Sequence, residues 1–220
     1  WMQAIICCTD EGLVMASDSL SVDEHDGAQA TMQKVYPLGM HAAILTSGAA
    51  IGVQLSRDLS QWLQARQLED FDDTVAVSRD FLAQGYAHHL RARHGRSGQH
   101  APAERHLYFA IGGYSGQQAS SPYLAILLHS EAGDLPFQEM RLPRVFTLPR
   151  KVVFEGRVTR QFAEGIGLRP LATVCLEALA GMAERKPEAV GGPFDVAIVR
   201  SSGTELVETP PGLADTEADS

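Results

Sequence analysis

Residues 3–19 read QAIICCTDEGLVMASDS and contain two apolar segments separated by a short polar turn. The segments 3–9 and 12–18 are apolar at almost every position, which is typical of β-strands that are covered on both faces. Asp10, Glu11 and Gly12 supply the turn residues of a hairpin. We therefore predict two paired, buried strands, with Asp18 at the end of the second.

The rest of the chain alternates between groups of strands and pairs of helices. Further strands are predicted near residues 31–38, 40–46, 105–113, 122–130, 136–142, 194–200 and 204–208. Helical spacing of apolar residues predicts helices that begin at 47–48 and at 70–72, a short helix at 158–165 and a longer one at 170–185. Residues 19–30 are polar and are predicted to form a loop. Residues 143–157 are expected to be irregular, with room for a short strand.

This order of elements predicts an α+β protein built as a four-layer α-β-β-α sandwich. Two antiparallel sheets would face each other, and a pair of helices would flank each sheet. A chain of 220 residues is long enough to bury a substantial core, and we assign residues 1–208 to a single domain. Residues 209–220 form an acidic tail that is predicted to be disordered.

Composition narrows the classes of function and partner. With 45% hydrophobic and 20% charged residues the chain matches a soluble globular protein, and a net charge of −9 argues against a nucleic-acid partner. No run approaches the roughly 20 apolar residues that span a bilayer, and no basic segment precedes the first apolar run, so neither a membrane partner nor a secretory signal is expected. The three cysteines, Cys7, Cys8 and Cys175, are predicted to be free, buried thiols in a reducing cytoplasm.

The remaining local patterns do not predict a metal or a cofactor. Adjacent helical residues diverge by about 100°, so His88, His89 and His94 do not converge on a metal. The glycines of GGYSG (112–116) lack the spacing of a phosphate-binding loop. The basic stretch 88–96 (HHLRARHGR) has two interpretations, a solvated helix end and a functional basic patch.

Four segments carry a resemblance to a known family: GLVMASDS (12–19), TMQKV (31–35), LTSGAA (45–50) and VGGPFDVAIV (190–199). These segments resemble proteasome-type β subunits of the N-terminal-nucleophile hydrolase superfamily, and are most similar to the bacterial ancestral β subunits (Anbu). The resemblance implies the N-terminal-nucleophile hydrolase fold, which is the same α-β-β-α sandwich. It also implies a cytoplasmic, threonine-type peptidase family whose members assemble into rings or stacks.

The resemblance assigns a role to each matched residue. In that family an N-terminal threonine attacks the peptide carbonyl while an adjacent base takes its proton. Lys34 would be the lysine beside the nucleophile, Asp18 would orient it, and the Gly48 amide would stabilise the oxyanion at a helix N-terminus. A peptide or unfolded protein would bind along the positions Leu20, Val22, Thr46 and Ala50. Without the resemblance, Asp18 is a strand-end acid that binds loop amides, and Lys34 is a solvated strand residue.

The nucleophile position is where this sequence departs from the family. Counting back from Asp18 without gaps places the nucleophile at Met2, whose thioether has no ionisable proton. Leu20 stands where the family has an arginine, residues 154–157 (FEGR) replace a serine-rich turn, and residues 184–192 (ERKPEAVGG) lack the family's aspartate. We therefore predict a self-assembling proteasome-β-like subunit that is catalytically impaired.

Two alternatives stay open at the level of sequence. The chain could be an active N-terminal-nucleophile peptidase or amidase whose mature first residue differs from the one given, or one in which another group acts. It could instead be an unrelated cytoplasmic binding domain. Whether the protein is an enzyme depends on which of these holds.

Overall fold

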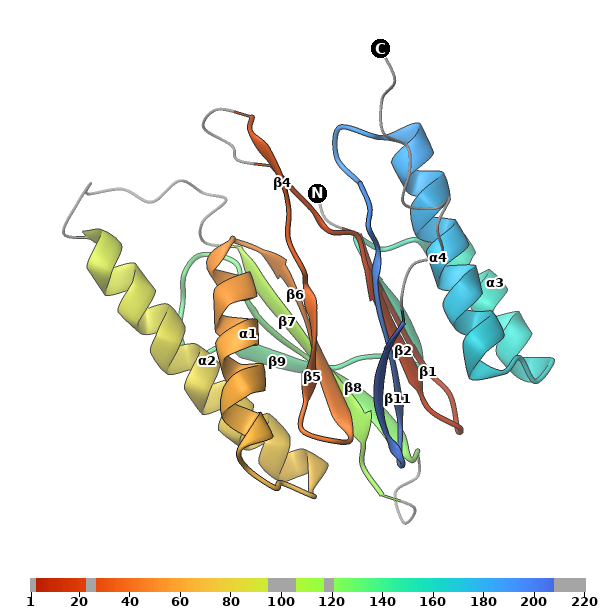
Figure 1. Cartoon of the computed structure of the whole chain (residues 1–220), viewed down its shortest axis with the longest axis horizontal. Coiled ribbons are helices and arrows are strands. Elements are labelled where there is room, and N and C mark those ends of the chain that lie inside the picture. Colours follow the sequence, from red (N-terminus) through yellow and green to blue (C-terminus); the bar gives the residue numbers. More distant parts are fainter. Residues whose placement is uncertain (1–2, 23–26, 95–105, 117–120, 208–220) are drawn as a thin grey trace.

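The computed structural model describes residues 3–22, 27–94, 106–116 and 121–207, which form four layers (Figure 1). Two five-stranded antiparallel sheets face each other in the centre. Helices α1 and α2 cover the outer face of one sheet, and helices α3 and α4 cover the outer face of the other. The predicted α+β fold, a four-layer α-β-β-α sandwich, is confirmed.

The first sheet contains the hairpin predicted from residues 3–19. Its order is β10-β1-β2-β11-β12, with bounds Val145–Leu148, Ala4–Cys8, Leu13–Ser17, Asp195–Arg200 and Gly203–Val207. In the β1–β2 pair Ala4 lies opposite Ser17, so the hairpin turn is at one end of the sandwich and Asp18 is at the other. Helices α3 (Val152–Ala163) and α4 (Leu168–Arg185) pack on this sheet.

The second sheet has the order β5-β6-β7-β8-β9. The bounds of its strands are Val35–Leu38, Ala42–Gly48, Leu107–Tyr114, Tyr123–Ser130 and Gln138–Arg141. Helices α1 (Ile51–Gln64) and α2 (Phe71–His94) cover it. Helix α1 buries Leu55, Leu59 and Leu63 against the sheet, because residues four apart lie on one helix face.

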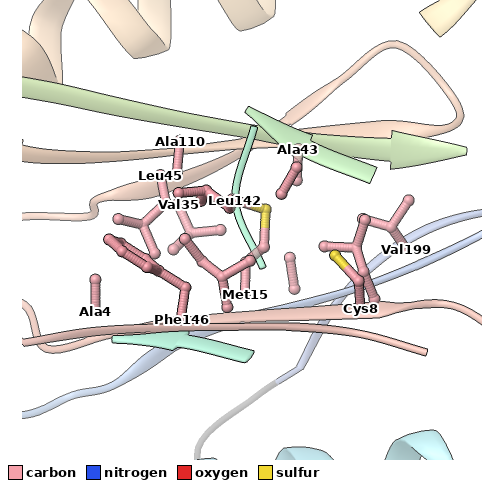
Figure 2. Close-up of a cluster of buried hydrophobic side chains, with 14 of the residues drawn as sticks. Ala4, Cys8, Met15, Val35, Ala43, Leu45, Ala110, Leu142, Phe146 and Val199 are labelled. Atoms are coloured by element: carbon pink, nitrogen blue, oxygen red, sulfur yellow. The ribbon is translucent and has the colours of Figure 1, made fainter. Parts of the chain in front are cut away.

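Three hydrophobic cores hold the layers together, one between the sheets and one under each pair of helices. Figure 2 shows the central core, where Met15, Val35 and Phe146 meet between the sheets. Successive residues of a strand point to opposite faces, so β1 sends Ala4, Ile6 and Cys8 into this core and Ile5 and Cys7 toward α3 and α4. The continuous apolar character of β1 follows from this burial on both faces.

The sequence predicted a loop for residues 19–30, and this prediction was wrong for part of the region. Strands β3 (Leu20–Val22) and β4 (Gln29–Thr31) pair there as a separate two-stranded sheet. Their side chains are half-buried or exposed. The pairing therefore depends on backbone hydrogen bonds, which leave no hydrophobic alternation in the sequence.

The region 143–157 is more regular than predicted. It contains β10 and the beginning of α3, which spans Val152–Ala163 rather than 158–165. Val152 and Val153 are exposed while Glu155 is buried, so the first turn lacks the usual apolar stripe. Residues 154–157 (FEGR), which stand where the sequence analysis places the family's serine-rich turn, lie inside this helix.

Several other predictions have structural outcomes. Cys7, Cys8 and Cys175 are free and buried, as predicted. None of the described helices is long and apolar enough to cross a membrane. Within the described ranges, no cluster of three or more His, Cys, Asp or Glu side chains is arranged to hold a metal ion.

Some predictions fall wholly or partly on residues outside the described ranges. The basic stretch 88–96 reaches the end of α2 at His94, and residues 95 and 96 lie outside the described part. Met2 and the acidic tail 209–220 also lie outside it. The assignment of residues 1–208 to one domain stays a prediction.

A buried carboxylate fixes the turn from β10 into α3. Glu155 accepts hydrogen bonds from the Thr147 amide and hydroxyl, at 3.1 and 2.7 Å, and from Arg150 Nε at 2.8 Å. Hydrogen bonds from Arg150, followed by those from Thr147, lower the pKa of Glu155 to about 2. Because the folded pKa is depressed below the ordinary value of 4.5, the stabilisation is present above that value and is lost as the pH falls toward 2.

Glu155→Gln is expected to lower the free energy of unfolding by about 2 kcal/mol at pH 7. The difference from wild type should shrink between about pH 5 and pH 2, because the carboxyl group of the unfolded wild type takes up its proton in this range, before that of the folded state does. Urea unfolding at pH 7 and pH 2.5 measures it. Glu205→Gln, which alters an exposed pair with Arg169, is the control and should cost less than about 1 kcal/mol. If Glu155→Gln lowers the free energy of unfolding equally at both pH values, the lowered pKa of Glu155 would be contradicted.

Candidate functional site

Asp18 lies immediately after β2 and is completely buried. Its Oδ1 accepts a hydrogen bond from the Gln3 amide at 3.0 Å, and its own amide donates to the Gln3 carbonyl at 3.2 Å. These bonds hold the carboxyl group beside the beginning of β1. Asp18 therefore does bind a backbone amide, as the purely structural interpretation expected. Its second oxygen, Oδ2, is buried without a hydrogen-bond partner in the part of the chain that is described.

Lys34 directly precedes β5 and is 4% exposed, so the interpretation as a solvated strand residue is wrong. Its Nζ lies 3.6 Å from Asp18 Oδ1 and donates a hydrogen bond to the Leu20 carbonyl at 2.5 Å. The backbone carbonyl of Lys34 accepts from the Thr46 amide at 3.0 Å. The structure thus brings together Asp18, Leu20 and Lys34, with β6 alongside.

Burial shifts the pKa values of the two partners of this ion pair in opposite directions. It raises the pKa of Asp18, and the Lys34 ammonium and the Gln3 amide act against that shift. Burial also lowers the pKa of Lys34, and the Asp18 carboxylate acts against that shift. Burial therefore disfavours the charged form of both groups, and their mutual attraction partly offsets that effect.

The structure adds an acid that sequence reasoning missed. Asp195 is the first residue of β11, and its Oδ2 accepts a hydrogen bond from the Lys34 backbone amide at 2.5 Å. Burial raises the pKa of Asp195 to about 6, although the Lys34 amide and ammonium both oppose the shift. The available signal was a single charged residue in the apolar segment FDVAIV (194–199).

Gly48 ends β6, two residues beyond Thr46 and on the same side of the strand. At about 3.4 Å per residue it lies about 7 Å along the strand from the residue that bonds to Lys34. Its φ is +91°, and helix α1 begins three residues later at Ile51, with no side chain capping its N-terminus. The Ala49, Gly52 and Val53 amides in this region donate to the backbone oxygens of His106, Ala49 and Ala50. The oxyanion role of the Gly48 amide stays a prediction.

The predicted substrate-contacting residues occupy different environments. Leu20 is half-buried and Val22 is exposed on β3, and Ala50 is exposed in the turn before α1. The Thr46 side chain is buried, and its hydroxyl lies 3.4 Å from the Tyr108 carbonyl. Met2, the predicted nucleophile position, lies just before the described residues, next to Gln3. The roles assigned to all these residues remain predictions.

A separate hollow of about 390 Å³ lies at the other end of β1 from Asp18. Its walls include Cys8, Asp10, Tyr123, Arg141 and Arg144. Arg144 forms an ion pair with Asp10 across the rim. The hollow therefore does not belong to the cluster around Lys34.

Comparison with known proteins identifies the fold. No protein-family profile and no curated protein sequence matches this chain. Among solved structures, a helical assembly of the Anbu complex from Pseudomonas aeruginosa has a TM-score of 0.69 at 17% identity, covering 96% of this chain and 87% of that one.

Two further structures have the same fold. Anbu (ancestral β-subunit) from Yersinia bercovieri has a TM-score of 0.63 at 13% identity, covering 94% of this chain and 87% of that one. A Gly-1 mutant of Anbu from Hyphomicrobium sp. strain MC1 has a TM-score of 0.63 at 16% identity, with coverage of 95% and 88%. The resemblance predicted from the four sequence segments is confirmed at the level of fold.

Proposed function

We propose that this chain is a proteasome-β-like subunit that assembles with copies of itself into a ring or a stacked, helical complex, and that its threonine-peptidase site is impaired. The Anbu-type fold, shared over most of both chains, supports the first part. A similar protein of Pseudomonas aeruginosa forms a helical assembly, and self-association of this chain is proposed by analogy with it.

The observation that carries the proposal is the buried Asp18–Lys34 pair beside the beginning of β1. A buried lysine costs free energy unless it is paired, and here it is held by a carboxylate and a backbone carbonyl. In an N-terminal-nucleophile hydrolase such a lysine takes the proton of the attacking hydroxyl. Gly48 would place its amide toward the resulting oxyanion.

The impairment follows from the side chain in front of Gln3. The residue at that position is Met2, and a thioether has no proton to give to Lys34 and cannot attack a carbonyl in this way. Asp18, Lys34 and Gly48 would then have no competent nucleophile at the position before Gln3. A peptide lying along Leu20, Val22, Thr46 and Ala50 would be bound without being cleaved.

The competing function is an active peptidase or amidase, and the lowered pKa of Lys34 favours it. That function requires a hydroxyl or thiol nucleophile within reach of Lys34. The three free, buried thiols support a reducing compartment, and a cytoplasmic location is part of the proposal in both versions.

Light scattering of the purified chain after size-exclusion chromatography tests the assembly. The subunit mass is 23.8 kDa, and the expected result is a molar mass of several subunits that falls only on strong dilution. A molar mass of one subunit at every concentration would overturn the proposed assembly.

A further inference from the structure

A hydrogen bond between Asp195 and Lys34 connects the two sheets. Asp195 begins β11 in the first sheet, and Lys34 directly precedes β5 in the second. The hydrogen bond from the Lys34 amide to Asp195 Oδ2, at 2.5 Å, spans 161 residues of sequence. The Val35 amide also favours the charged form of this carboxyl group. The backbone of Lys34 is therefore fixed from the opposite sheet, while its side chain is fixed by Asp18 and Leu20.

The charges of this cluster do not balance. Two carboxyl groups, Asp18 and Asp195, share one ammonium group, that of Lys34. Both carboxylates favour the protonated lysine and oppose the effect of burial on it, and the Asp18 charge raises the pKa of Asp195. The cluster carries one net negative charge when Asp195 is ionised, and none when Asp195 is protonated.

We propose that Asp195 is a positioning residue for Lys34: it anchors the lysine backbone across the gap between the sheets, and its negative charge favours the protonated side chain. The importance of this for catalysis or ligand binding rests on the proposed function. The backbone anchor and the effect of the charge can be tested separately, because asparagine retains an oxygen that accepts the amide hydrogen bond but has no charge. Alanine removes both.

The experiment follows the ionisation of Lys34 by NMR in the full chain. The sequence has three lysines, Lys34, Lys151 and Lys186, so lysine labelled with ¹³C at Cε gives few signals, and Lys34→Arg identifies the one of interest. In the wild type, the Lys34 signal should also show a second inflection near pH 6, as Asp195 titrates. The Asp195→Asn variant should lose that inflection and shift the Lys34 midpoint downward, and should keep a higher urea midpoint than Asp195→Ala because it retains the amide hydrogen bond.

The Asp195→Ala variant should shift the Lys34 midpoint downward and also lower the urea midpoint, because the tether is lost. Asp10→Asn, which removes an exposed carboxylate at the other end of β1, is the matched control and should leave Lys34 unchanged. A wild-type titration without the inflection near pH 6, or a Lys34 midpoint that is the same in all variants, would overturn the proposal. Because the readout needs neither assembly nor turnover, its failure is distinct from a single-subunit molar mass.

Discussion

Replacement of Lys34 by methionine is expected to lower the free energy of unfolding by about 3–5 kcal/mol at pH 7, because Asp18 is then buried without its counter-charge. Methionine keeps most of the aliphatic chain, so lost packing contributes little. Loss of the Lys34 ammonium group raises the pKa of Asp18 further, so Asp18 can escape part of the penalty by taking up a proton. The loss should therefore be smaller at pH 5 than at pH 7, as measured by urea unfolding.

The double variant Asp18→Asn, Lys34→Met separates the charge from the packing. It removes the unpaired carboxylate, and should be more stable than Lys34→Met alone because neighbouring sites in one network are not additive. Lys186→Met is the control, because Lys186 is exposed and its replacement should change stability by less than about 0.5 kcal/mol. If Lys34→Met costs no more than this control, the pair does not hold the site together.

Replacement of Gly48 by alanine is expected to cost on the order of 3 kcal/mol or more. The φ of +91° disfavours any side chain, and a Cβ atom would lie 2.1 Å from the His106 carbonyl oxygen. That oxygen belongs to the backbone that enters β7, so it cannot rotate away, and the pairing of β6 with β7 must shift. The same shift would displace the Gly48 amide from its proposed oxyanion position.

Gly39→Ala is the matched control for this change. Gly39 also has a positive φ, +59°, in the turn between β5 and β6, but nothing lies within 4 Å of a Cβ built there. Its replacement should therefore cost only the conformational strain, about 1 kcal/mol. Thermal and urea unfolding of both variants give the comparison, and equal losses would contradict the close approach of His106 to Gly48.

The layers of this fold were predictable because buried strands and helices have characteristic local patterns of apolar residues. β1 is apolar on both faces because one face meets the other sheet and the other meets two helices. β3 and β4 were missed because their side chains are largely open to solvent, and their pairing leaves no apolar alternation. The beginning of α3 was missed because its first turn exposes Val152 and Val153 and buries Glu155.

The site was predictable only in part. Asp18 and Lys34 were found through short segments on either side of them, and the structure places their side chains 3.6 Å apart. Asp195 was missed because its partner is a backbone amide 161 residues away in the other sheet. No local pattern encodes that approach, which depends on how the two sheets stack.

Native mass spectrometry of the purified chain, after incubation with a covalent threonine-protease probe, tests the proposed function most directly. One spectrum reports both the number of subunits in the particle and whether any subunit carries the probe. We expect particles of several subunits, each with its unmodified mass near 23.8 kDa. A spectrum of single subunits, or of subunits that each carry one bound probe at the N-terminal residue, would contradict it.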